Sequence, residues 1–186
     1  MRNRYEIQGD VTVIFLQRGM TTVIDTVDLP KACSFPNQWR ATKRSDGKGW
    51  YVQSSIRING KRRNQMLHRW LTDAPRDMQV DHRDHDGLNN RRISNLRVVT
   101  QSQNQQNRKG AIGKTGHRGV YPKSNGYKVE ITVNNKRFYF GFYFDIDEAA
   151  EVAAEARRRL MPFTQEVGQQ NDDLWNEISS RYLNSA

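Results

Sequence analysis

Short apolar runs alternate with polar gaps along the first 66 residues, and this pattern predicts β-strands. Residues 11–16 and 22–25 are rich in β-branched side chains and are separated by a gap that contains Gly19. Two more pairs of runs flank the dipeptides Asp46-Gly47 and Asn59-Gly60. Both dipeptides are typical of tight hairpin turns, because their residues tolerate a positive φ. We therefore expect a small antiparallel sheet within residues 1–66.

The pattern changes after residue 66. Residues 67–71 suit a short helix that ends before Pro75, residues 78–81 suit a strand, and residues 96–99 suit a second strand. Thr100 is a favourable helix N-cap with Gln103 three positions later, which is a capping-box pattern. A strand, loop, strand and helix in this order should bring Asp81, His82 and Asn104 together.

Period-two alternation returns at residues 127–133, and residues 137–141 follow as a second strand after Asn134-Asn135. Asp145 is a favourable cap for a helix whose small apolar residues recur at helical spacing from residue 149 to residue 160. This part predicts a three-stranded antiparallel sheet packed on one helix. Residues 110–116 suit a glycine-containing linker, and the acidic tail 163–186 suits one more short helix. The expected fold class is α+β.

Charge and composition favour a nucleic-acid partner. The 186-residue chain carries a net charge of +10 with an isoelectric point near 10.0, and its mean hydropathy is −0.90. Between residues 40 and 63 there are eight Lys or Arg residues against one acidic residue, Asp46. Such an excess repels itself unless a polyanion neutralises it, so Arg62 and Arg63 are expected to contact phosphates. Trp39, Trp50 and Tyr51, interleaved with these charges, either stack on bases or form the core of the sheet.

Other classes of partner and site fit the sequence less well. An anionic membrane surface would call for a basic amphipathic helix, which is not evident, and no run approaches the length of a membrane span. The lone Cys33 excludes an intramolecular disulfide and a cysteine-rich zinc site. We therefore expect a cytoplasmic, DNA-associated protein with no obligate protein partner.

Residues 80–107 concentrate the candidate chemistry. The carboxylate of Asp81 and the amide of Asn104 are oxygen donors that suit a hard divalent ion, Mg²⁺ or else Mn²⁺. His82, with an ordinary pKa of about 6.5, could take a proton from an attacking water. His68 is expected to contact a phosphate or to be structural, and a ligand role stays open. The arginines expected to grip the flanking phosphates are Arg91, Arg92 and Arg97.

The Asp81-His82 pair, the run Asn95-Leu96-Arg97 and Asn104 resemble the HNH (ββα-metal) nuclease motif of phage and mobile-intron homing endonucleases. The resemblance implies that Asp81 and Asn104 bind the metal and that His82 is the general base. It implies that Asn95 ties the loop together by hydrogen bonds and helps to orient His82. His85 and an Asn89–Asn95 segment one residue longer than usual depart from the motif, so His85 either assists or only shapes the loop.

The third part resembles the AP2/ERF-type DNA-binding domain, on landmarks that begin with His117-Arg118-Gly119-Val120-Tyr121 and continue to Glu148-Ala149-Ala150. The resemblance implies that the sheet enters the major groove of double-stranded DNA. Tyr127 has an alternative role in the core of the sheet. The positions expected to contact DNA are Arg118, Tyr127, Lys128, Thr132, Lys136, Arg137 and Tyr139.

Together these features predict five regions. They are a β-rich DNA-binding or support region (1–66), an HNH nuclease unit (67–109), a linker (110–116), an AP2/ERF-like domain (117–162) and a tail helix (163–186). The expected function is sequence-directed, metal-dependent cleavage of DNA in a bacterial or phage-infected cell. The alternatives are a non-catalytic AP2-type regulator with a relic HNH unit and, third, a protein that acts on RNA.

Overall fold

The computed structural model describes residues 1–107, 113–164 and 169–183, and the chain forms two compact units, Met1–Asn104 and Gln105–Ala186. The predicted border at residue 66 lies inside the first unit. The predicted linker 110–116 lies partly outside the described residues.

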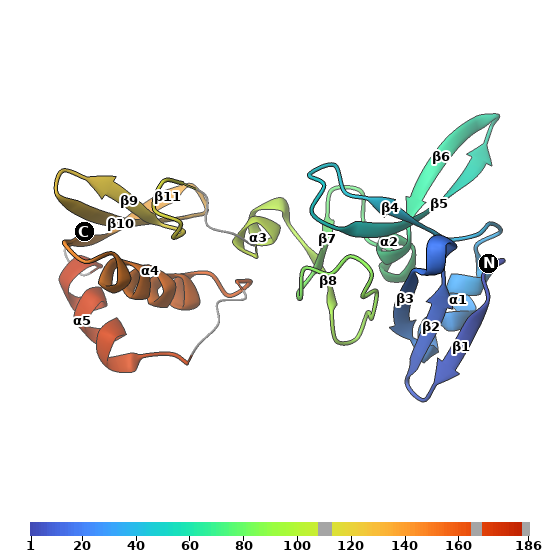
Figure 1. The fold of residues 1–186 in the computed structure, drawn as a ribbon, viewed down its shortest axis with the longest axis horizontal. Coiled ribbons are helices and arrows are strands. Elements are labelled where there is room, and N and C mark those ends of the chain that lie inside the picture. The colour runs from blue at the N-terminus through green and yellow to red at the C-terminus, as the bar shows by residue number, and fades with distance from the viewer. Residues whose placement is uncertain (108–112, 165–168, 184–186) are drawn as a thin grey trace. The chain divides into compact units, whose positions relative to one another are not determined.

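The first unit contains two three-stranded antiparallel sheets where a single sheet was expected (Figure 1). The first sheet has the order β1-β2-β3, and β1 was not predicted. Two single turns of 3-10 helix flank β3, and the short helix α1 (Leu29–Ser34) follows it. The second sheet has the order β4-β5-β6. The strands are β1 (Tyr5–Gln8), β2 (Val11–Phe15), β3 (Thr21–Asp25), β4 (Arg40–Lys43), β5 (Trp50–Ile58) and β6 (Lys61–Met66).

The hairpin between β5 and β6 turns at Asn59-Gly60, as predicted. Ile58 pairs with Lys61, so only two residues form the turn. Asn59 has a φ of 50° and Gly60 a φ of 73°. Two consecutive positive φ values match a type I′ turn, whose twist suits antiparallel strands.

The predicted strand, loop, strand and helix follow α2 (Leu67–Thr72). They are β7 (Gln79–His82), β8 (Leu96–Val99) and α3 (Gln101–Gln106), with β7 and β8 antiparallel. The capping box is confirmed in both directions. The backbone N–H of Gln103 donates to Thr100 Oγ1 at 3.2 Å, and the backbone N–H of Thr100 donates to Gln103 Oε1 at 2.8 Å.

One hydrophobic core joins the N-terminal sheets to α2. Ile14 and Ile24 from the first sheet, Val52 from the second and Leu67 from α2 are all fully buried in the same cluster. Trp39 is also completely buried there, which confirms the core alternative for this side chain. Burial of these side chains is the main force that holds the two sheets and α2 together.

The second unit has the predicted sheet and helix. Its sheet has the order β11-β10-β9, and the apolar stripe of α4 is buried against Val129, Ile131 and Phe140. The tail helix α5 packs against α4 and β11, with Ile178 buried in the same core. The elements are β9 (Val120–Lys123), β10 (Gly126–Val133), β11 (Lys136–Tyr143), α4 (Ile146–Leu160) and α5 (Asp172–Tyr182).

In the described parts of the chain, no helix has the length and apolar character needed to cross a membrane.

Candidate active site

Asp81 and His82 lie at the end of β7. In the register of the hairpin, Asp81 pairs with Arg97 and His82 pairs with Leu96 of β8. Both side chains are almost covered, with exposed fractions of 8% for Asp81 and 6% for His82. Because neighbouring side chains of a strand point to opposite faces, the two groups have different surroundings.

His82 lies in a cluster of aromatic rings. Its ring centroid is 5.0 Å from that of His68 on α2 and 5.9 Å from that of Tyr51 on β5. Burial lowers the pKa of the His82 imidazole, although a hydrogen bond to Asn90 and the nearby carboxylates, first that of Asp84, act in the opposite direction. A lowered pKa keeps the imidazole neutral at pH 7, so that it can accept a proton.

His68 does not occupy the position expected of a phosphate-contacting residue. Its exposed fraction is 7%, and burial is the main cause that lowers the pKa of its imidazole to about 3. Within the described residues its Nδ1 atom has no hydrogen-bond partner. A neutral, covered ring cannot neutralise a phosphate, so the burial of His68 favours the structural alternative over a DNA contact. Its place is beside the candidate base.

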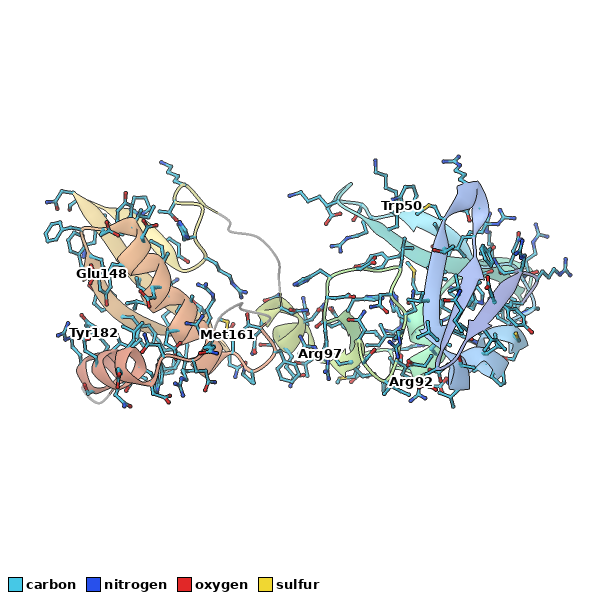
Figure 2. The ribbon with its side chains drawn as sticks, turned by 60° about the horizontal axis from the view of Figure 1, so that its bottom comes forward. Trp50, Arg92, Arg97, Glu148, Met161 and Tyr182 are labelled. Atoms are coloured by element: carbon cyan, nitrogen blue, oxygen red, sulfur yellow. The ribbon has the colours of Figure 1, made fainter. Side chains whose placement is uncertain are left out.

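The three arginines expected to grip phosphates are each paired with a buried carboxylate. Arg97 donates from Nε to Asp81 Oδ2 at 2.8 Å. Arg91 donates to Asp25 at 2.9 Å, and Arg92 donates to both oxygens of Asp28. Figure 2 labels Arg92, which precedes β8, and Arg97, which lies on it. These pairs tie the arginines to the protein itself, so their predicted availability for DNA is not supported.

The loop between β7 and β8 is held by its own polar side chains. Asn95 accepts a hydrogen bond from the backbone N–H of Asp84 at 3.0 Å and donates to the carbonyl of Asn89 at 2.7 Å. His85 has a φ of 66° and donates its backbone N–H to the His82 carbonyl, which is a turn role. Asn95 thus ties the loop together as the resemblance implied. The side chain next to His82, however, is that of Asn90.

Gly87 lets this loop approach β5. A Cβ atom at residue 87 would lie 2.2 Å from the carbonyl oxygen of Trp50 and 2.5 Å from a ring carbon of Tyr51. A side chain there would push the loop away from Tyr51, which borders His82. The glycine therefore maintains the packing of the ring cluster.

Strand β3 supports the other side of the loop. The backbone N–H of Asn90 donates to the Val23 carbonyl at 2.8 Å, and the N–H of Val23 donates to the Leu88 carbonyl at 3.2 Å. Thr22 also donates its hydroxyl to that carbonyl, at 2.6 Å. Sequence reasoning treated Asn90 only as part of a polar bend, and it assigned no site role to Thr22, Asp25 or Asp28. The partners are more than 60 residues apart, and no local pattern marks them.

The two side chains predicted to bind a metal, Asp81 and Asn104, offer oxygen donors, which hard divalent ions prefer. Asp81 supplies a carboxylate. The Asn104 side chain reaches back from α3 and donates its Nδ2 to Gln79 Oε1. Gln79 lies two residues before Asp81 and therefore on the same face of β7. Across the part of the chain that the structure describes, no group of three or more His, Cys, Asp or Glu residues is placed to hold an ion.

An open basic groove crosses the second sheet of the first unit. It has a volume of about 820 Å³ and involves residues of β4, β5 and β6. Among the described residues that line it, four are arginines and none is acidic: Arg2, Arg40, Arg57 and Arg62. Arg63, which also lies on β6 and is exposed, is not among the lining residues. Hydrogen-bonding side chains such as Gln53 and Asn64 lie between the arginines.

In the second unit, four of the seven predicted DNA-contacting residues lie on one face of the sheet. Cross-strand pairs place Thr132 opposite Arg137, and Glu130 opposite Tyr139. Lys128 is two residues from Glu130 and points the same way, while the core residues Val129 and Ile131 alternate with them. The four residues on the face away from the core are Lys128, Thr132, Arg137 and Tyr139. Lys136 is exposed beside the turn.

The other two residues are placed differently. Tyr127 packs against the core, which is the alternative stated for it. Arg118 donates from Nη1 to the carbonyl of Gln106 at 2.8 Å and from Nη2 to that of Gln105 at 3.2 Å. Its guanidinium therefore satisfies carbonyls at the end of α3, so the predicted DNA contacts of Tyr127 and Arg118 are not supported.

Comparison with known proteins gives two findings. The family model described as HNH endonuclease matches residues 73–106, which include β7, β8 and α3. An uncharacterised HNH endonuclease of Acanthamoeba polyphaga mimivirus is 34% identical over 92 residues, which is 46% of this chain. The chain covers 48% of the length of that relative, about half. No solved structure matches the chain. Residues 73–106 are therefore the part of the chain that is similar to HNH endonucleases.

Proposed function

We propose that this chain is a metal-dependent endonuclease that hydrolyses phosphodiester bonds of double-stranded DNA. The observation that carries the proposal is that the matched residues 73–106 contain a buried His82 and a neighbouring carboxylate, Asp81, at the end of one strand. The lowered pKa of His82 suits a general base at neutral pH.

In the proposed reaction His82 accepts a proton from water while the water oxygen forms a bond to phosphorus. The bond from phosphorus to the 3′ oxygen breaks, and that oxygen leaves with the bonding pair. Asp81 and Asn104 would hold a divalent ion, Mg²⁺ or Mn²⁺. When bound, the ion neutralises charge on the scissile phosphate and on the leaving oxygen. Asn95 keeps the loop in the shape that faces His82.

The surroundings of Asp81 also favour one rival function. The carboxylate is already neutralised by Arg97, and an ion would have to compete with or share this partner. A non-catalytic DNA-binding regulator with a relic HNH unit would keep that ion pair undisturbed. The two functions differ in whether divalent metal produces cleavage.

The proposed DNA contacts lie outside the HNH unit. In the first unit the arginine-lined groove, with Arg62, suits the sugar-phosphate backbone because its described lining carries positive charge and hydrogen-bond donors without a carboxylate. In the second unit the AP2-like assignment, with Lys128, Thr132, Arg137 and Tyr139 on DNA, is supported by their shared face opposite the core. A homing-type enzyme would use such modules to choose its site.

Cleavage of supercoiled plasmid or of a target duplex, with Mg²⁺ and with EDTA, tests the enzymatic proposal. The wild-type protein should cut only with the metal, and His82→Ala should lose most of this activity. A wild-type protein that binds DNA but leaves it intact with Mg²⁺ or Mn²⁺ would establish the regulator instead. If His82→Ala cuts DNA as fast as the wild-type protein, His82 is not the general base.

DNA affinity tests the second unit separately. Arg137→Ala should weaken binding to the target, because Arg137 is exposed on the proposed DNA face. Arg181→Ala is a matched control, since Arg181 is an exposed arginine on α5 that pairs with Glu177. Equal effects of the two substitutions would argue against the AP2-like face.

A further inference from the structure

Thr22 and Asn90 form a buried polar connection between β3 and His82. Thr22 has an exposed fraction of 1% and Asn90 of 0%. Asn90 Nδ2 donates to Thr22 Oγ1 at 2.9 Å, and 3.4 Å separates Asn90 Oδ1 from His82 Nε2. Thr22 lies about 50 residues before the matched HNH segment and belongs to the N-terminal sheet.

The direction of each hydrogen bond in this connection is determined by its partners. The Thr22 hydroxyl donates its proton to the Leu88 carbonyl at 2.6 Å, because a carbonyl can only accept. Thr22 Oγ1 is therefore an acceptor toward Asn90. The second acceptor for Asn90 Nδ2 is the carbonyl of Gly87, at 3.2 Å. Two acceptors on one side require the amide nitrogen there, so Oδ1 must face His82.

An amide oxygen facing His82 Nε2 selects one form of the neutral ring. Oδ1 can only accept, so Nε2 carries the proton and the lone pair is on Nδ1. The charged ring also carries a proton on Nε2 and donates to Asn90 Oδ1, so this hydrogen bond raises the pKa of His82 against the effect of burial. A base must present its lone pair to the water, and this form presents Nδ1.

We propose that Thr22 is a positioning residue for His82, which acts through the side-chain amide of Asn90 to hold the imidazole in its Nε2–H form. The inference rests on the proposed role of His82 as general base. It gives the N-terminal sheet a part in the chemistry, because β3 supplies both Thr22 and the backbone carbonyl of Val23 that binds Asn90.

The decisive substitution is Thr22→Val, which keeps the shape of the side chain and removes the hydroxyl. One N–H of Asn90 then loses its acceptor in a buried site, which favours rotation of the amide away from His82. We expect kcat for DNA cleavage to fall about 10- to 100-fold, as for other outer residues that orient a functional group, with KM little changed. Thr22→Ser retains the hydroxyl and should recover most of the wild-type kcat.

Thr12→Val is the matched control. Thr12 is also a buried threonine of the first sheet, and its hydroxyl lies 3.1 Å from that of Thr26, which lies outside the HNH loop. It should lose at most a few-fold in kcat. If Thr12→Val lowers kcat as much as Thr22→Val, or if Thr22→Ser fails to recover activity, the effect is one of general packing and the proposal is overturned.

A nitrogen NMR measurement tests the inference without any cleavage. In the wild-type protein at pH 7, the ¹⁵N shifts of the His82 ring should identify a protonated Nε2 and an unprotonated Nδ1. The Thr22→Val protein should show a mixture of the two forms, and Thr22→Ser should return to one. A protonated Nδ1 in the wild type would overturn the proposal even if Thr22→Val did not fold. If the wild-type protein shows the expected Nε2–H form but does not cut DNA, the positioning role of Thr22 is retained and the proposed nuclease activity is refuted.

Discussion

Asp25 illustrates how one buried carboxylate can order a distant loop. It lies at the end of β3, and its two oxygens accept from Arg91 Nε at 2.9 Å and from the backbone N–H of Ile93 at 2.7 Å. Both donors belong to the segment just before β8. A charged acceptor strengthens these bonds, and removing it leaves a partly covered guanidinium without its counter-charge.

Replacing Asp25 by Asn should therefore lower the free energy of unfolding by about 2 kcal/mol, since each hydrogen bond to a charged group contributes more than a neutral one. Urea denaturation followed by fluorescence measures this loss. Asp46→Asn is the control, because Asp46 forms an exposed pair with Arg44 and its loss should hardly change stability. Similar losses for both variants would contradict the structural role assigned to Asp25.

His68 predicts a pH dependence of stability. Its imidazole has a pKa of about 3 when folded and about 6.5 when unfolded, so between these values the unfolded chain binds more protons. The contribution of the neutral His68 to the free energy of unfolding is therefore fully present above about pH 6.5, and it is lost as the pH drops toward 3. The slope from this group approaches about 1.4 kcal/mol per pH unit. Urea titrations at pH 7, 6 and 5 measure it.

His68→Leu should make this slope shallower, because the variant has no imidazole to protonate at residue 68. His82, whose pKa is also lowered by burial, keeps part of the dependence. An unchanged slope in His68→Leu would mean that residue 68 is not the group that resists protonation.

At the scale of elements, local capping and turn chemistry set several boundaries. The N-cap of α4 is Asp145, whose Oδ1 accepts from the backbone N–H groups of Asp147 at 2.7 Å and Glu148 at 2.9 Å. Asn171 caps α5 by accepting from the Leu174 N–H. These caps satisfy N–H groups that have no partner within the helix itself.

Asp145→Ala should lower the free energy of unfolding of the second unit by about 1 kcal/mol, the usual cost of losing an N-cap. Thermal unfolding monitored by circular dichroism can detect it. Asp145→Ser should retain most of the stability because serine is also a good cap. A serine variant as unstable as the alanine variant would show that the charge, rather than the capping bonds, is important.

At the scale of the whole molecule, positive charge is concentrated in the first compact unit. Residues 1–104 carry 18 Lys and Arg against 10 Asp and Glu, a net charge of +8 of the total +10. Several of these cations form ion pairs within the protein, such as Arg92 with Asp28. The arginines of the groove on the second sheet, by contrast, remain beside one another without a carboxylate among the described lining residues.

The salt dependence of DNA binding tests this groove. The double substitution Arg57→Ala with Arg62→Ala should weaken binding and reduce the slope of log K against log salt by roughly two, one for each phosphate that an arginine no longer neutralises. Fluorescence anisotropy with a duplex at several salt concentrations measures the slope. Arg92→Ala, which removes an internally paired arginine, should leave the slope nearly unchanged. The reverse order of effects would place the DNA on the HNH loop instead of the groove.

Local sequence signals specify most elements of both units. Alternation, the Asn59-Gly60 turn and the capping box at Thr100 act through residues only a few positions apart, so they could be recognised without tertiary information. The same local pattern placed Asp81 and His82 at the end of β7. Their catalytic and metal-binding roles remain predictions.

What each polar side chain contacts depends on the packed fold. The sequence around Arg91, Arg92 and Arg97 does not indicate that these arginines are paired. In the fold each of them forms an ion pair with a carboxylate. The contacts of His82 with His68 and, through Asn90, with Thr22 join segments that the core brings together from distant parts of the chain. Such pairings depend on how the sheets pack over the shared core, and no periodicity within a single segment records that packing.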